Sequence, residues 1–256
     1  MKSSITRHII ILLYYCIREG GTVLSINKIF FDLDDTLHDH QKPFAEALIH
    51  IFPTFPQRKH IQSVYKRLRH YSDLLWVDYN AGTKSLDELR IERIILALKD
   101  FHFPISKSQA SEFQQRYEQE LFNISLFHEI PEILSELQQR FEIGIITNGP
   151  VKHQSNKIKA LGLERFIPSD RIFISDGLGI AKPDPNIFLE VAKRVKGVPH
   201  EMLYIGDTWK NDVIGPIEAG WQAIWFNHRK RQRETDHQPM SEITTLHELI
   251  PKIILT

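Results

Sequence analysis

The segment FFDLDDTL, residues 30–37, decides how the rest of the chain is interpreted. An apolar run that ends at Phe31 is typical of a buried strand, and three aspartates follow it directly. Side chains two apart on an extended chain point to the same side, so Asp32 and Asp34 share one side of the strand's carboxyl end. Two ionised carboxylates this close repel each other unless something such as a divalent cation neutralises them. The segment therefore predicts either a metal and nucleophile site or an acidic turn after an edge strand.

The composition narrows the class of protein. The 256 residues contain 32 Lys plus Arg and 32 Asp plus Glu, which gives no electrostatic reason to expect a nucleic acid polymer or a membrane as partner. The single cysteine, Cys16, excludes an internal disulfide and a cysteine-based zinc site, and it favours a reducing, cytoplasmic location. The composition leaves both a monomer and a homodimer open.

The N-terminal segment, residues 1–24, differs from the rest of the chain. Basic residues precede an apolar run over residues 9–17, as in a signal peptide. This run is too short to cross a bilayer, and no small-x-small cleavage site follows it. We interpret residues 1–24 as an N-terminal extension or a mis-assigned translation start.

Two patterns divide the remaining chain. Helical periodicity without a convincing strand fills residues 40–122, and Ser85 with Glu88 predicts a capping box within it. Helices and strands then alternate, which is typical of an α/β protein with a doubly wound, mostly parallel sheet. We predict a core domain of residues 25–39 and 123–256, with an all-helical cap of residues 40–122 inserted after the first strand.

The alternating region predicts individual elements. Later strands are expected at 142–147, 171–175, 202–205 and 223–226. The strand at 223–226 is expected to be the last of the core, followed by a charged loop and a closing helix over 243–254. Ligands of doubly wound sheets bind outside the carboxyl ends of the strands. Polar residues stand at or after these ends, namely Asp32, Asp34, Thr147, Asn148, Lys182, Asp207 and Asp212.

These clusters resemble, in the right order, the four motifs of the haloacid dehalogenase-like hydrolases, most of which are magnesium-dependent phosphatases. DLDDT at 32–36 is similar to the first motif, Asp-x-Asp-x-Thr. Thr147 resembles the second and Lys182 the third, and Gly206-Asp207 with Asp212 resembles the fourth. The helical stretch after the first motif is similar to the family's cap. The resemblance implies a Rossmann-like core that hydrolyses phosphoric monoesters.

The resemblance also implies catalytic roles. Asp32 would attack phosphorus and form an aspartyl-phosphate, as the family does. Asp34 would protonate the leaving alcohol and then accept a proton from the attacking water. Thr147 and Asn148 would bind phosphate oxygens, and Lys182 would stabilise Asp32 and the charge of the transition state.

The implied cofactor is Mg²⁺. It would be held by Asp32, the backbone carbonyl of Asp34, and Asp207. Asp212 would support this shell, either by orienting waters or by pairing with Lys182.

Asp34 also separates the classes within the family, because dehalogenases need no leaving-group protonation and have no aspartate at that position. A phosphatase is therefore favoured, while a phosphomutase and a catalytically silent regulatory binding protein stay open. The expected substrate is a small phosphorylated metabolite, a nucleoside monophosphate or a sugar phosphate, selected by the cap. Some cap residues have two possible roles: they contact the substrate, or they only pack and form ion pairs within the cap. These residues are Trp76, Tyr79, Asn80, Arg90 and Arg93.

Overall fold

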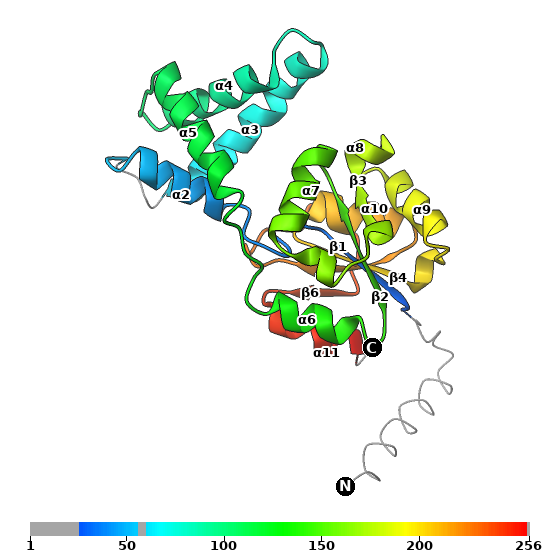
Figure 1. Cartoon of the computed structure of the whole chain (residues 1–256). Coiled ribbons are helices and arrows are strands. Elements are labelled where there is room, and N and C mark those ends of the chain that lie inside the picture. The colour runs from blue at the N-terminus through cyan, green and yellow to red at the C-terminus, as the bar shows by residue number, and fades with distance from the viewer. Residues whose placement is uncertain (1–25, 56–59, 255–256) are drawn as a thin grey trace, which may run out of the picture.

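The structure is a computed structural model that describes residues 26–55 and 60–254. The N-terminal segment at 1–24 lies outside the described residues. Figure 1 shows a layered core and a separate group of helices above it. The strands are β1 Lys28–Phe31, β2 Glu142–Thr147, β3 Ile172–Ile174, β4 Met202–Gly206, β5 Gln222–Phe226 and β6 Ser241–Ile243. The core helices are α6 Ile130–Leu137, α7 Val151–Ala160, α8 Ser175–Leu178, α9 Pro185–Arg194, α10 Gly215–Glu218 and α11 Leu249–Ile254.

The core contains one sheet whose neighbouring strands are all parallel, in the order β3-β2-β1-β4-β5-β6. The chain builds outwards from β1 in one direction and then returns to build in the other, which places helices on both faces. The predicted fold class, a doubly wound sheet with an all-helical cap inserted after the first strand, is confirmed.

Alternating side chains of β1 serve the two faces of the sheet. Ile29 and Phe31 belong to a hydrophobic cluster with residues of α6, α7 and α11. Phe30 points into a second cluster with α9 and the aromatic ring of Trp221. Burial of large apolar side chains on both faces, worth about 1.5–3 kcal/mol for each, holds β1 at the centre of the sheet.

In the described residues, the cap is a bundle of four helices with its own hydrophobic core. Phe44 and Phe113 are fully buried at its centre, with ring centroids 5.6 Å apart. The predicted capping box at the start of one helix is confirmed, since Glu88 N–H donates to Ser85 Oγ and Ser85 N–H donates to Glu88. The cap helices are α2 Lys42–Ile51, α3 Ile61–Asn80, α4 Leu86–Lys99 and α5 Lys107–Glu120.

The expectations for the last strand and for the closing helix were both wrong. The strand at 223–226 is not the last, because β6 adds to the sheet at Ser241–Ile243 and the closing helix begins only at Leu249. The helix after β4 begins as a π-helix at Trp209 and becomes α-helical at Gly215. Short 3₁₀ helices complete the core at Leu163–Arg165, Ser169–Arg171, Pro199–Glu201 and Leu246–Glu248.

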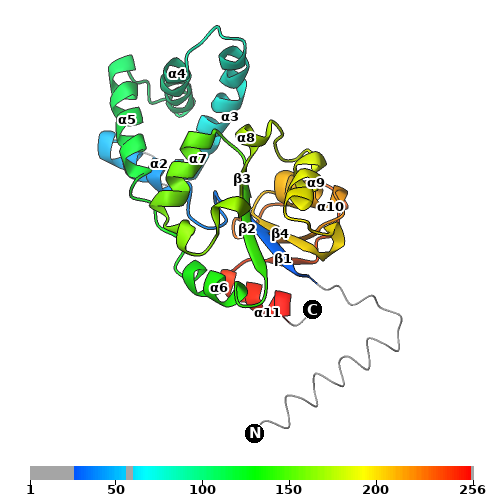
Figure 2. The same cartoon turned by 45° about the vertical axis from the view of Figure 1, so that its right-hand side comes forward.

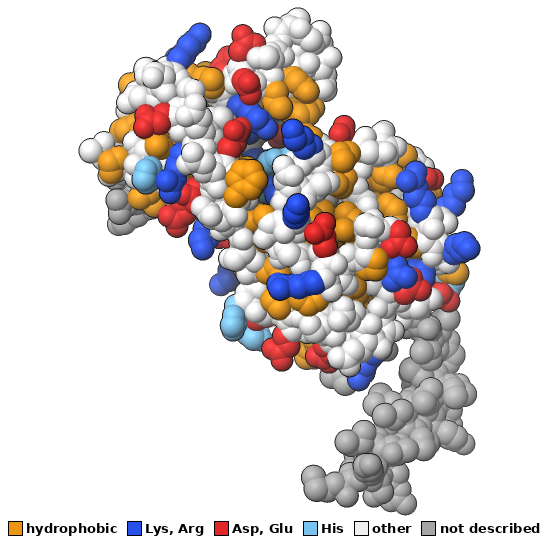
Figure 3. Space-filling view, viewed as in Figure 1, with side chains coloured by type: hydrophobic (Ala, Val, Ile, Leu, Met, Phe, Trp, Pro, Cys, Tyr) orange, Lys and Arg blue, Asp and Glu red, His pale blue; other side chains and the backbone are white. Residues whose placement is uncertain are grey.

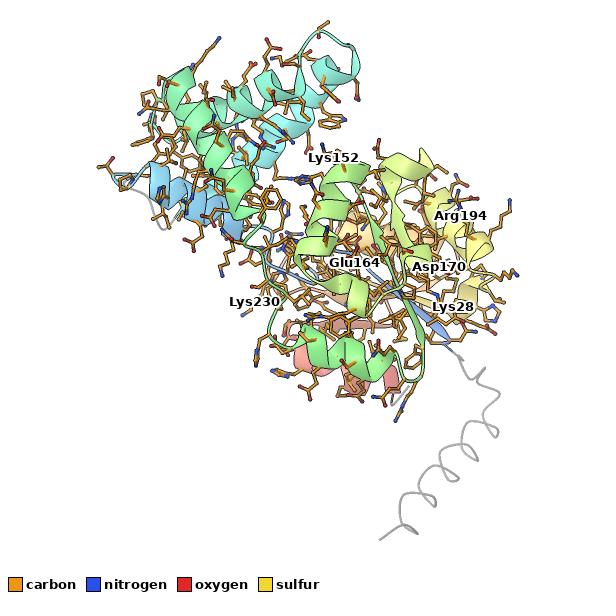
Figure 4. The ribbon with its side chains drawn as sticks, in the orientation of Figure 1. Lys28, Lys152, Glu164, Asp170, Arg194 and Lys230 are labelled. Atoms are coloured by element: carbon orange, nitrogen blue, oxygen red, sulfur yellow. The ribbon has the colours of Figure 1, made fainter. Side chains whose placement is uncertain are left out.

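The cap lies over the edge of the sheet where the strands end. Figures 1 and 2 both show α3 of the cap beside α7 of the core. In Figure 4, Lys28 at the start of β1 lies far from the cap, whereas Lys230, in the loop after β5, lies where the two parts join. Across the described ranges, none of the helices combines the length and the apolar composition that a membrane span requires.

Candidate active site

Three adjacent strands bring predicted site residues to one edge of the sheet. Asp32 follows β1, Thr147 ends β2, and Asp207 follows β4. β1 lies between the other two strands, and the Asp32 amide donates to the Ile205 carbonyl across 2.9 Å. Lys182 reaches the same edge from the segment between α8 and α9. The parallel topology therefore assembles residues that are distant in the sequence.

Lys182 is the buried centre of this assembly. Its Nζ lies 2.8 Å from Asp32 Oδ1, 2.6 Å from Asp212 Oδ1 and 2.7 Å from Tyr204 Oη. Tyr204 Oη in turn donates to the carbonyl of Ile146 at 2.6 Å. Burial alone would lower the pKa of the Lys182 ammonium, but the two carboxylates outweigh it and hold that pKa well above its usual range. Lys182 is therefore a fixed positive charge beside Asp32.

Asn148 and Thr147 are held by side-chain hydrogen bonds. The side-chain amide of Asn148 makes two hydrogen bonds with the backbone of Lys182. Its Oδ1 accepts from the Lys182 N–H at 3.0 Å, and its Nδ2 donates to the Lys182 carbonyl at 2.8 Å. Thr147 Oγ1 accepts from Gln154 Nε2 at 2.6 Å, which leaves the threonine hydroxyl proton available to another acceptor. Asn148 thus positions Lys182, and Gln154 orients Thr147.

Asp34 accepts hydrogen bonds from a cluster of basic groups. His38 Nε2 and His40 Nδ1 each lie 2.8 Å from Asp34 Oδ1, and Lys157 Nζ lies 2.7 Å from it. Burial would raise the pKa of Asp34, but the charges of His40 and Lys157 and the hydrogen bonds from both histidines hold that pKa well below its usual range. Asp35, at φ 61°, turns the chain back so that both histidines reach Asp34.

Asp32, Asp207 and Asp212 form a compact group of carboxylates. Oxygen atoms from all three lie within 4.8 Å of one another. Gly206 permits this approach, because a β-carbon there would lie 2.5 Å from the β-carbon of Asp212. Burial raises the pKa of Asp32 to about 7. The charge of Lys182 lowers this pKa, and the charge of Asp212 raises it. Burial and the neighbouring carboxylates Asp212 and Asp32 raise the pKa of Asp207 well above its usual range. Crowded hard oxygen donors of this kind fit Mg²⁺.

The loop after β5 adds two arginines that the sequence did not point to. Arg231 Nη1 lies 3.0 Å from Asp207 Oδ2. Arg229 Nη2 lies 2.7 Å from Asp35 Oδ1, and its Nη1 donates to Gln41 Oε1 at 3.0 Å. These contacts join the loop to both the acidic group and the start of the cap.

A cavity of about 450 Å³ opens between core and cap at this site. Figure 3 shows the two lobes meeting, with several basic side chains along their boundary. All the predicted core residues line the cavity, namely Asp32, Asp34, Thr147, Asn148, Lys182, Asp207 and Asp212. The other wall comes from α3 between Gln62 and Asp73, with Gln62, Tyr65, Lys66, Arg69, His70 and Asp73.

The predicted cap contacts are not among the residues that line the cavity. Trp76 and Tyr79 lie on the second half of α3, partly exposed, with their rings 4.9 Å apart. Arg90 pairs with Glu118 at 3.0 Å, and Arg93 hydrogen bonds to side chains of α3 and α5. The structure does not bring these side chains to the site, and their part in substrate choice stays a prediction.

Several residues of the site were missed in the sequence. Gln154 and Lys157 are buried polar residues three apart on α7, and this spacing on an amphipathic helix was an available signal. His38 and His40 follow the first motif so closely that their approach to Asp34 was also foreseeable. Tyr204 gave no signal, because a tyrosine within an apolar strand is indistinguishable from core packing.

The fold and this arrangement of acidic and basic residues define a class of protein. A family model for haloacid dehalogenase-like hydrolases matches residues 26–220. The chain therefore belongs to the haloacid dehalogenase-like hydrolases.

Individual relatives share most of this chain. The HAD-hydrolase YfnB of Bacillus subtilis is 29% identical over 86% of this chain and 92% of its own. Its crystal structure, bound to magnesium, superposes with a TM-score of 0.68 over 90% of this chain and 99% of that chain, at 27% identity. A glyceraldehyde 3-phosphate phosphatase of Pyrococcus abyssi is 30% identical over 80% of this chain and 83% of its own. The pyrimidine 5'-nucleotidase PynA of Streptococcus pneumoniae is 25% identical over 87% of this chain and 92% of its own.

Proposed function

We propose that this hydrolase is a Mg²⁺-dependent phosphoric monoester hydrolase that acts on a small phosphorylated metabolite, either a nucleoside monophosphate or a sugar phosphate. One observation carries the proposal: Asp32 is bound by Lys182 at 2.8 Å, and Asp34 lines the same cavity two residues later. A nucleophile and a separate acid–base group are what a two-step phosphoryl transfer requires. Relatives named as phosphatases and nucleotidases support this class.

In the first step, an Asp32 carboxylate oxygen attacks phosphorus and the bond to the leaving alcohol oxygen breaks. Lys182 neutralises charge beside the attacking oxygen, and the Thr147 hydroxyl donates to a phosphate oxygen. Asp34 rests as the carboxylate. The negative charge of the arriving phosphate favours protonation of Asp34 by solvent, and Asp34 then gives this proton to the leaving alcohol oxygen. In the second step, Asp34 takes a proton from water, which attacks the aspartyl-phosphate and releases phosphate.

The carboxylates of Asp32, Asp207 and Asp212 are the side chains that would hold Mg²⁺. The family resemblance adds the Asp34 carbonyl as a further ligand. Bound there, the ion would supply positive charge to the phosphate oxygens and neutralise the crowded carboxylates. Asp212 also binds Lys182 at 2.6 Å, and its other oxygen accepts from the Thr208 amide at 2.9 Å. It therefore fixes the cation and the loop that carries Asp207.

Phosphate release from a panel of phosphorylated metabolites tests the proposal. We expect release that requires Mg²⁺, stops with EDTA and falls by at least about 10³-fold in Asp32→Asn, since the nucleophile is lost. Circular dichroism of the variant controls for its fold. Release that survives Asp32→Asn would overturn the mechanism, and the absence of release from every compound would favour a mutase or a binding protein.

A further inference from the structure

The cap wall of the cavity is formed by one face of α3. The lining residues recur at helical spacing, so Tyr65, Lys66, Arg69 and Asp73 face the core together. Among the described residues, no hydrogen bond or ion pair within 4.0 Å joins Lys66 or Arg69 to another side chain. Asp73, one turn after Arg69, lies outside ion-pair distance as well.

The remaining cap arginines in the described ranges are paired within the cap. Arg67, two residues from Arg69, binds Asp100 and Tyr71 on the side of α3 away from the cavity. Arg90 and Arg116 bind Glu118 and Glu120, and Arg93 donates to two side chains. Arg69 therefore differs from its neighbours, because its guanidinium is directed to the cavity and no cap carboxylate neutralises it.

Arg69 lines the same cavity as Asp34, the proposed acid–base group, and the two come from opposite walls. Asp34 already pairs with Lys157 at 2.7 Å and accepts hydrogen bonds from His38 and His40, and no ion pair joins it to Arg69 within the described residues. A planar cation with five N–H donors therefore lines the cavity that the alcohol part of the substrate would enter.

We propose that Arg69, assisted by Lys66, binds a second anionic group on the alcohol part of the substrate, and this inference rests on the proposed function. The substrate class is a phosphomonoester that carries a further carboxylate or phosphate, such as a phosphorylated sugar acid or a sugar bisphosphate. A guanidinium binds either group through two parallel hydrogen bonds. Lys66, one turn before Arg69 on the same face, adds a second positive charge to the binding position.

Matched substrate pairs test this proposal. 3-Phosphoglycerate and glycerol 3-phosphate differ only in a carboxylate against a hydroxymethyl group, and fructose 1,6-bisphosphate and fructose 6-phosphate differ in a second phosphate. We expect kcat/KM to favour the anionic member of at least one pair by about 10- to 100-fold, as for a charge-assisted hydrogen bond. The pair that shows the preference identifies the anion.

Variants of α3 assign the preference to Arg69. Arg69→Gln should abolish it and Arg69→Lys should restore part of it, whereas Arg67→Gln, on the same helix but facing Asp100, should leave it unchanged. Three results would each overturn the proposal. They are equal activity on both members of each pair, a preference for uridine monophosphate over all four metabolites, and a loss of activity in Arg69→Gln that is the same for every substrate.

A binding measurement separates this proposal from the proposed function. The aryl part of p-nitrophenyl phosphate carries no second carboxylate or phosphate, so its turnover tests the phosphatase alone. If it is not hydrolysed, calorimetric titration of the Asp32→Asn protein with the same four metabolites still decides. Tighter binding of the anionic members that is lost when Arg69→Gln is added supports the inference, and equal affinities overturn it.

Discussion

The two walls of the cavity contain similar charged side chains in different electrostatic states. On the core wall, each cation lies close to a carboxylate: Lys182 is 2.6 Å from Asp212, and Arg229 is 2.7 Å from Asp35. On the cap wall, Lys66 and Arg69 have no such partner within the described chain. Paired, buried charges are already oriented before the substrate arrives, which suits chemistry that is the same for every phosphomonoester. Unpaired charges retain their full attraction for a ligand, which suits substrate choice.

The largest test of this comparison removes one cation from each wall. Lys182→Met leaves Asp32 and Asp212 buried together without their cation, so we expect a loss of about 3–5 kcal/mol in the free energy of unfolding and the loss of phosphate release. Arg69→Met leaves no carboxylate unpaired, so its urea midpoint should equal that of the wild type. A similar fall in the midpoint of both variants would contradict the distinction between the walls.

A smaller effect is expected when the acid–base group is changed. Asp34→Asn should lower kcat by about 10²–10³-fold for an alkyl phosphate, because the alkoxide leaves poorly without a proton. The loss should be much smaller for p-nitrophenyl phosphate, whose phenolate leaves unprotonated. The ratio of the two losses is the measurement, with Asp73→Asn, a carboxylate on the cap wall, as the matched control. Equal losses on both substrates would assign Asp34 to binding rather than proton transfer.

The core wall was largely predictable, and the cap wall was not. Asp32, Thr147 and Asp207 each stand at the end of a strand, and a parallel sheet must bring such ends together. The position of a cap side chain depends instead on how the helix is rotated and how far it extends over the core. Tyr65 and Trp76 look equally suitable in sequence, yet only Tyr65 lines the cavity.

Contacts between distant elements determine the other features that the sequence did not predict. Tyr204 lies within an apolar strand, and Arg229 lies in a charged loop, so neither pattern differs from ordinary packing or a solvated surface. β6 is only three residues long, Ser241–Ile243, and it forms because β5 offers an open edge rather than because its sequence favours a strand. Tertiary structure, not local preference, determines these positions.

A third test compares the hydrophobic cores of the two regions. Phe113 is fully buried in the cap cluster, and Phe188 is fully buried in a core cluster. Truncation of either to alanine costs about 3 kcal/mol or more through lost burial and the cavity left behind. We expect Phe113→Ala to speed amide hydrogen exchange in α2–α5 while β1–β5 keep their protection, and Phe188→Ala to do the opposite. Equal changes in both regions would show that cap and core unfold as one unit.

The smallest expected effect concerns pH and a histidine on α7. Burial, helped by the charge of Lys157, lowers the pKa of His153 from 6.5 to about 4. The unfolded chain therefore binds a proton at a higher pH than the folded chain, so stability is complete above pH 6.5 and falls as the pH drops towards 4. Between pH 7.5 and 5.5 this one group should contribute a loss of about 1 kcal/mol, which His153→Gln should remove. Urea unfolding of both proteins at the two pH values measures the difference. His102→Gln, whose histidine lies on an exposed turn of the cap, serves as the control. An identical pH dependence in wild type and His153→Gln would mean that His153 is protonated without cost in the folded core.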